Sequence, residues 1–200
     1  MPFRTSLIGI KRAARFLRMA YGFPVVGGLA VLWLLHAGET PCAAQTGTQR
    51  EYELKAAVLY HIIEYVEWPA DAPAKETTEL TIGLIGQIPF QDALQVLAGK
   101  NVRGRKITIK RLSSPEEAAS CQVVFIGASE KTKFPEIVAD LKSHPILTVS
   151  EAEGFAERGG MVNLLAGPNR IVMEINREVA TEAKLTLSSQ LLKHAKVVSR

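Results

Sequence analysis

Two adjacent serines near the end of the chain are the side chains that most resemble a nucleophile. Ser188 and Ser189 lie in a segment with helical spacing of apolar residues, and no lysine stands three residues after either one. The chain contains no G-x-S-x-G, H-E-x-x-H, G-x-G-x-x-G or G-x-x-x-x-G-K-[ST] pattern. Because a serine nucleophile needs a base placed beside it, the sequence predicts no enzyme, no catalytic residue and no cofactor.

Histidine, cysteine and acidic residues are too scattered to predict a metal site. His61 and Glu64 lie three residues apart on one predicted helix, and two ligands fall short of the four that a structural zinc site uses. Glu67 stands three residues beyond Glu64, and we interpret this acidic pair as solvated charge. Cys121 is the one cysteine beyond residue 44. A buried cysteine usually packs as a small apolar side chain, and an intermolecular disulfide is the alternative.

One basic cluster is dense enough to contact a charged partner. It comprises Lys100, Arg103, Arg105, Lys106, Lys110 and Arg111. No aromatic residue interleaves these cations, so the pattern does not favour nucleic acid. The cluster is interpreted either as an exposed loop and strand face or as a rim that contacts an acidic partner or anionic lipid headgroups. Trp68, followed by Pro69, is either a core residue that ends a helix or an interface anchor.

Residues 1–44 predict a secretory signal peptide. The start carries five basic residues, and an apolar run of about 13 residues follows at 23–35, too short for a membrane-spanning helix. Small residues at Cys42 and Ala44 predict cleavage after Ala44 and a periplasmic location. An uncleaved membrane anchor is the alternative. We expect residues 45–50 to form a disordered polar tail and residues 51–198 to form a single domain.

Removing this signal segment changes the charge of the chain. The whole chain has 24 Lys+Arg and 20 Asp+Glu, with a net charge of +4. Residues 45–200 retain 19 basic and 19 acidic residues, so the basic isoelectric point belongs mostly to the segment that is removed. The sequence therefore predicts no nucleic-acid partner.

Apolar patterning in residues 51–198 predicts an α/β fold. We expect helices at 51–68, 90–97, 114–119 and 134–141, and strands at 80–85, 106–112, 122–126, 145–149, 161–165 and 171–175. Asn176 is expected to cap a long final helix. This alternation predicts a mainly parallel sheet with helices on both faces and a C-terminal antiparallel hairpin.

Several short motifs, in order along residues 51–198, resemble the YfiR-like family of small periplasmic proteins. They are KAA (55–57), LY (59–60), YVEWP (65–69), Gly86 with Pro89-Phe90, Gly99-Lys100, Gly104-Arg105, CQVVFI (121–126), LTVS (147–150), Gly154-Phe155, GGMVN (159–163), Ile175-Asn176 and SSQLL (188–192). The combination is specific, whereas no single motif would be. On these motifs the candidate interface residues are Glu67, Trp68, Pro69, Arg103, Arg105, Cys121, Asn163, Ser188 and Ser189.

The resemblance implies a non-enzymatic regulator that restrains an inner-membrane diguanylate cyclase by binding its periplasmic part. It also implies sequestration by an outer-membrane lipoprotein, dimerisation, and redox control through disulfides. This chain departs from the family at Gly83, where the resemblance implies a cysteine facing Cys121. The alternative function is a small-molecule sensor domain that serves a sensor kinase or transporter, with a pocket near Gly86 or Gly127.

Overall fold

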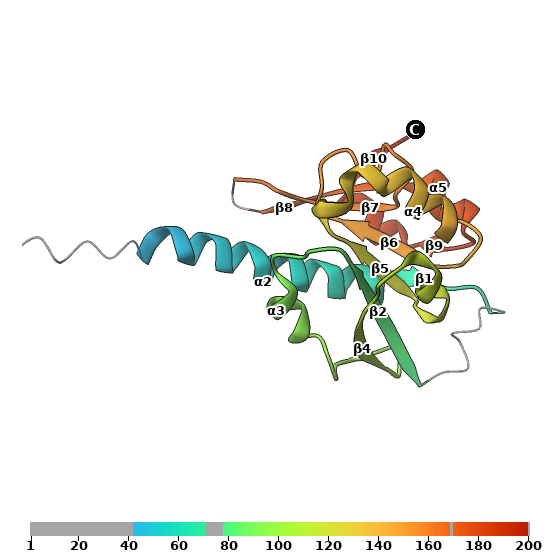
Figure 1. Cartoon of the computed structure of the whole chain (residues 1–200), viewed down its shortest axis with the longest axis horizontal. Coiled ribbons are helices and arrows are strands. Elements are labelled where there is room, and N and C mark those ends of the chain that lie inside the picture. Colours follow the sequence, from blue (N-terminus) through green and yellow to red (C-terminus); the bar gives the residue numbers. More distant parts are fainter. Residues whose placement is uncertain (1–41, 71–77, 169, 200) are drawn as a thin grey trace, which may run out of the picture. The chain divides into compact units, whose positions relative to one another are not determined.

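A mainly parallel sheet is the framework of the molecule. The structure, a computed structural model, describes residues 42–70, 78–168 and 170–199 (Figure 1). The main sheet contains β2 (Glu79–Ile85), β3 (Asn101–Val102), β4 (Arg105–Arg111), β5 (Val123–Ile126), β6 (Leu147–Ser150), β7 (Val162–Ala166), β8 (Ile171–Asn176) and β10 (Lys196–Val198). Within the described residues these eight strands take the order β10-β8-β7-β6-β5-β2-β4-β3. The β3–β4 and β7–β8 pairs are antiparallel and the other pairs are parallel, which confirms the predicted fold class.

Helices cover both faces of this sheet. They are α2 (Cys42–Glu64), α3 (Gln91–Gln95), α4 (Phe134–Leu141), α5 (Arg177–Glu182), α6 (Ser189–Lys193) and the 3₁₀ helices η2 (Pro115–Ser120) and η3 (Ala128–Lys133). Residues of α2, α3, α5 and α6 share one apolar cluster, and residues of η2 and α4 share another. A small antiparallel pair, β1 (Val66–Glu67) with β9 (Thr186–Leu187), follows the end of α2.

Strand β5 shows how one short run of residues builds both cores. Val123 and Phe125 belong to the first cluster, whereas Val124 and Ile126 belong to the second. All four side chains are fully buried. Successive side chains of a strand point to opposite faces, so a continuous apolar run is what a strand covered on both sides requires.

Helix α2 is longer at its start than the sequence predicted. It begins at Cys42 and includes residues 45–50, so the expectation of a disordered tail there is wrong. Residues 47–50 are exposed, and the Gln49 side chain donates a hydrogen bond to Glu53, one helical turn on, at 3.0 Å. Figure 1 shows this first half of α2 projecting beyond the sheet. The predicted cleavage point after Ala44 falls inside α2, and residues 1–41 of the expected signal peptide lie outside the described residues.

The predicted long final helix is wrong. Asn176 does cap α5, because its side chain accepts a hydrogen bond from the Val179 N–H at 3.1 Å. However, α5 ends at Glu182, and Lys184 adopts a left-handed conformation with φ of 60°. The chain then forms β9, α6 and β10 in turn. Strand pairing of β9 with β1 and of β10 with β8 outweighs the helical spacing of the apolar residues.

Candidate functional site

The end of α2 brings together several of the candidate interface residues. Glu67 lies in β1 and is exposed, and its carboxylate lies 3.9 Å from the Arg103 guanidinium. The Arg103 Nε–H also donates a hydrogen bond to the Glu64 carbonyl at 3.1 Å. Trp68 is half-buried, and its indole N–H donates to the Gln122 carbonyl at 3.3 Å. Three stretches of chain that are distant in sequence therefore meet at this end.

The tight turn between β3 and β4 presents the basic residues. Arg103 and Gly104 both have positive φ angles, of 50° and 80°, as a two-residue hairpin turn requires. The next residue, Arg105, is half-buried, and its Nε and Nη2 atoms are buried without a hydrogen-bond partner. Burial lowers the pKa of the Arg105 guanidinium, which nevertheless stays charged because its ordinary value is so high.

The two candidate serines have different surroundings. The Ser188 hydroxyl accepts a hydrogen bond from the Leu191 N–H at 3.2 Å and so caps α6. The Ser188 N–H donates to the Tyr65 carbonyl at 3.0 Å, which ties α6 to the end of α2. Ser189 is exposed at the start of α6. The geometry gives Ser188 a capping contact and gives neither serine a base.

Cys121 and Gly83 lie on the opposite face of the sheet, in the cluster that contains α4. Cys121 is 3% exposed, and burial raises the pKa of its thiol. A Cβ atom at Gly83 would lie 3.0 Å from the Cys121 sulfur and 2.5 Å from Leu112 Cδ1. The thiol is therefore protonated and enclosed, and an intermolecular disulfide would require this part of the core to open.

Asn163 lies in a buried polar row rather than at a surface. It is fully buried in β7, and its side-chain N–H lies 3.5 Å from the Glu174 carboxylate. Its Oδ1 atom is buried without a hydrogen-bond partner. Lys196 binds the other Glu174 oxygen at 2.9 Å, and the pKa of Lys196 is raised by that hydrogen bond.

An apolar groove lies between α2, β8 and α6, and we call it the α2–α6 groove. Its volume is about 580 Å³, and its lining is Val58, His61, Ile62, Tyr65, Ile171, Met173, Gln190, Leu191, Lys193 and His194. Tyr65 is 37% exposed, whereas Ile62 and Leu191 are buried. This groove could not be predicted from the sequence, because nothing in the local pattern places α6 beside α2.

A second, polar groove lies where the sheet reverses its strand order. In doubly wound sheets ligands bind at the carboxyl ends of the strands that flank this reversal, which here are β2 and β5. Gly86, at the end of β2, lines a groove of about 510 Å³ together with charged residues such as Arg111 and Glu136. Gly127, at the end of β5, packs directly against the Gln87 backbone and leaves no room for a Cβ atom. Of the two predicted pocket positions, Gly86 lines this groove, and Gly127 is not among its lining residues.

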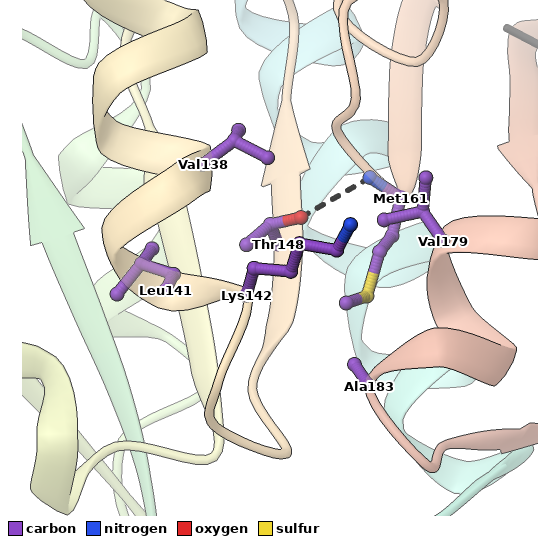
Figure 2. Close-up of a pocket in the computed structure, with 7 residues that line it drawn as sticks. All are labelled: Val138, Leu141, Lys142, Thr148, Met161, Val179 and Ala183. Carbon is purple, nitrogen blue, oxygen red and sulfur yellow. Dashed lines mark hydrogen bonds between the residues drawn. The ribbon is translucent and has the colours of Figure 1, made fainter.

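A third cavity, between α4 and α5, is too small for a ligand. Figure 2 shows Val138, Leu141 and Lys142 on one side, Val179 and Ala183 on the other, and Thr148 and Met161 between them. Its volume of about 10 Å³ is at the lower limit for holding a single water molecule. The Thr148 hydroxyl already accepts a hydrogen bond from the Met161 N–H at 3.1 Å. The cavity is therefore a packing gap.

Neither a metal site nor a membrane span is found among the described residues. In residues 42–70, 78–168 and 170–199, no three His, Cys, Asp or Glu side chains lie close enough to hold a metal ion. None of the helices in that part of the chain has both the length and the hydropathy needed to cross a bilayer.

The comparison with protein families identifies the chain. The sequence profile described as YfiR/HmsC-like matches residues 52–196. The chain belongs to the YfiR/HmsC-like family. The match begins in α2 and ends at the first residue of β10, so it includes the α2–α6 groove and the β3–β4 turn.

Two solved structures are similar to this YfiR/HmsC-like chain at low identity. A conserved domain protein from Vibrio cholerae O1 biovar eltor has 12% identity and a TM-score of 0.52 over 73% of this chain and 59% of its own. The ABC domain in complex with L-Trp from Streptococcus pneumonia has 14% identity and a TM-score of 0.46, over 62% of this chain and 57% of its own. The chain thus spans less than two thirds of the length of each of these two proteins. The Vibrio cholerae protein has the same fold as the matched part of this chain.

Members of the YfiR/HmsC-like family are periplasmic regulators of cyclic-di-GMP signalling, and the family is regulatory rather than catalytic. The described residues offer candidate contact surfaces at the end of α2, at the β3–β4 turn and at the α2–α6 groove.

Proposed function

We propose that this chain is a periplasmic regulator that binds the periplasmic part of an inner-membrane diguanylate cyclase and restrains it. The α2–α6 groove supports this proposal most directly. It is an apolar groove of about 580 Å³ on the surface of a protein whose family is regulatory. Protein interfaces concentrate their binding energy in such apolar pockets, and tyrosine is among the residues that contribute most.

The lining of the α2–α6 groove suggests the chemistry of its occupant. Ile62, Met173 and Leu191 make the floor apolar, so the inserted side chains should be aliphatic or aromatic. Lys193 and His194 are exposed at the rim, which favours acidic residues beside those anchors. We therefore expect the cyclase to insert an apolar segment with acidic flanks.

Restraint of the cyclase would follow from preferential binding. A regulator that binds the inactive conformation more tightly than the active one shifts the cyclase toward the inactive state. Shifting such an equilibrium from 1:99 to 99:1 requires about 10⁴-fold preference for one state. An outer-membrane lipoprotein that competes for the same surface of the regulator would release the cyclase. Self-association of the regulator would lower the concentration of free regulator that can bind the cyclase.

The proposal is tested by deleting the gene and measuring cyclic-di-GMP and biofilm. We expect both to rise, and we expect the wild-type gene to restore them. A Tyr65→Ala/His194→Glu variant, altered at two exposed positions of the groove, should fail to restore them. Lys131→Glu, an exposed position that does not line the groove, should behave as wild type. Unchanged cyclic-di-GMP, with no sensor protein co-purifying, would refute the cyclase proposal.

A small-molecule sensor is the second candidate function. The polar groove near Gly86 favours it, because acidic and basic side chains line about 510 Å³ at the end of β2. A specific ligand would raise the melting temperature of the purified protein in a metabolite panel. A Glu136→Gln/Asp140→Asn variant should lose that shift, and a shift that survives these changes would place the ligand elsewhere.

A further inference from the structure

The β3–β4 edge of the main sheet carries a concentration of positive charge, which we call the basic edge. It consists of Lys100, Arg103, Arg105, Lys106, Lys110 and Arg111. Residues 98–112 contain these six cations and no acidic residue. Every member except Arg105 is exposed. Because residues 45–200 are neutral overall, this edge makes the charge of the domain strongly asymmetric.

Glu79 of β2 lies beside Lys106 in the sheet register, whereas the contacts of Arg111 and Lys100 are with neutral groups. The Arg111 guanidinium donates to two neutral oxygens, the Gly86 carbonyl at 3.1 Å and the Gln91 side chain at 2.5 Å. The Lys100 ammonium lies 5.6 Å from the centre of the Tyr60 ring. Two nitrogens of Arg105 are buried without a hydrogen-bond partner.

Four lysines elsewhere in the described residues pair with carboxylates, namely Lys55, Lys133, Lys142 and Lys196. Lys55 pairs with Glu151 at 2.7 Å, and Lys142 pairs with Glu182 at 3.0 Å. Within the basic edge, the ion pair of Arg103 with Glu67 is long, at 3.9 Å. The basic edge keeps a net positive charge, because its six cations outnumber the neighbouring carboxylates of Glu67 and Glu79.

The arrangement around the basic edge favours a layer of headgroups over a protein partner. The buried centre of a protein interface is more apolar than the rest of the surface and is depleted of charged residues. Here the neighbouring α3 turn exposes a single large apolar side chain, Val96, which is 65% exposed. Tyr60 is half-buried beside the cations, with its hydroxyl donating to the Asn101 carbonyl and Lys100 over its ring, and amphipathic aromatic residues are typical of membrane interfaces. Cations distributed along the edge, together with one exposed apolar side chain, are suited to bind a charged lipid surface, because such binding requires no complementary shape.

We propose that the basic edge docks this domain on anionic phospholipid, with its cations on the phosphates of phosphatidylglycerol or cardiolipin. Each lysine or arginine near such a surface strengthens binding about fivefold. The attraction extends over about 8 Å at physiological ionic strength, so binding must weaken as salt is added. This proposal does not depend on the identity of the signalling partner.

The test is vesicle sedimentation with the protein expressed from its full-length gene and purified as the cell processes it. One set of vesicles is phosphatidylcholine alone, and the other contains phosphatidylglycerol as well. We expect salt-sensitive binding to the second set only. Lys106→Gln/Lys110→Gln removes two exposed charges and should weaken that binding about 25-fold, at fivefold for each cation. Lys131→Gln/Lys184→Gln removes two exposed charges elsewhere and should leave it unchanged.

Three results would overturn the proposal. The first is equal binding to both sets of vesicles, and the second is an equal loss in the Lys131/Lys184 control. The third is normal vesicle binding by the Lys106/Lys110 variant together with lost binding to a purified acidic periplasmic domain, which would indicate a protein partner. Melting temperatures exclude misfolding, and the reversal variant Lys106→Glu/Lys110→Glu should lose more affinity than the glutamine variant does.

Discussion

A cysteine introduced at Gly83 is expected to form a disulfide with Cys121. The Cβ position of residue 83 lies 3.0 Å from the Cys121 sulfur. The bond lengths of a disulfide place each Cβ about 3 Å from the far sulfur, so the new side chain starts at the required separation. Gly83→Cys would thus supply the second thiol at the position where the family resemblance implies a cysteine.

The size of the effect follows from the loop that the disulfide closes. Residues 83 and 121 enclose about 38 residues, and the loop-entropy relation gives about 4 kcal/mol of stabilisation for that length. The new Cβ would also lie 2.5 Å from Leu112 Cδ1, so Leu112 must move. Such overpacking costs about 1–3 kcal/mol. The oxidised variant should therefore exceed wild type by about 1–3 kcal/mol, and the reduced variant should be less stable than wild type.

Thermal unfolding with and without reductant separates these two contributions. The oxidised and reduced forms of Gly83→Cys differ only by the disulfide, so their melting temperatures should differ by about 8–16 °C. Gly83→Ser has nearly the same volume without a second thiol, and reductant should not affect it. Mass spectrometry should show the loss of two hydrogens and no free thiol in oxidised Gly83→Cys. If both thiols stay reactive in oxidising buffer, or if only dimers form, the geometric argument is refuted.

Three further predictions concern buried polar contacts. Lys55→Met should cost about 3–5 kcal/mol in chemical denaturation, because it removes the partner of the Glu151 carboxylate, whose side chain is only 10% exposed. Burial lowers the pKa of Lys55, but hydrogen bonds and charges of its carboxylate partners raise that pKa to a net value above 10.5. The ion pair therefore contributes its full stabilisation below pH 10.5 and loses it as the pH rises through the pKa of the folded state. Wild type should lose stability at alkaline pH more steeply than Lys55→Met, and equal slopes would contradict this assignment. Asn163→Asp places a buried carboxylate beside that of Glu174 and should destabilise the protein by several kcal/mol at neutral pH. Urea titrations should show that this loss of stability becomes smaller at acidic pH, because the introduced carboxylate is then protonated. Ser188→Ala should cost about 1 kcal/mol because it removes the α6 cap, whereas Ser189→Ala should be neutral by the same titration; equal effects would argue against the cap.

Elements that are specified by their own residues could be predicted from the sequence. The apolar run of β5 and the amphipathic helix α4 lie where the pattern predicted them. The β7–β8 hairpin was also correct, because Gly167 and Pro168 give the turn between its strands a clear local signal. In each case local preference and tertiary packing favour the same structure.

Elements that depend on distant partners could not be predicted in this way. Val66 and Glu67 extended the apparent helix toward Pro69, yet they pair with β9, more than a hundred residues away, and α2 ends at Glu64. The Lys55–Glu151 ion pair joins residues 96 positions apart. The α2–α6 groove exists only because the final segment breaks at Lys184 and returns to α2. Spacing alone cannot distinguish such a broken segment from a continuous helix.

The end of α2 links the two surfaces that we propose to be functional. Tyr65 lines the α2–α6 groove, while the Glu64 carbonyl and the Glu67 carboxylate hold Arg103 of the basic edge. This short segment is fixed on its other side by the hydrogen bond from the Ser188 N–H to the Tyr65 carbonyl. A domain docked through the basic edge would therefore hold its groove at a constant orientation to the membrane. Because a tethered pair meets at a high effective concentration, modest affinity at the groove would then suffice to restrain a membrane-bound partner.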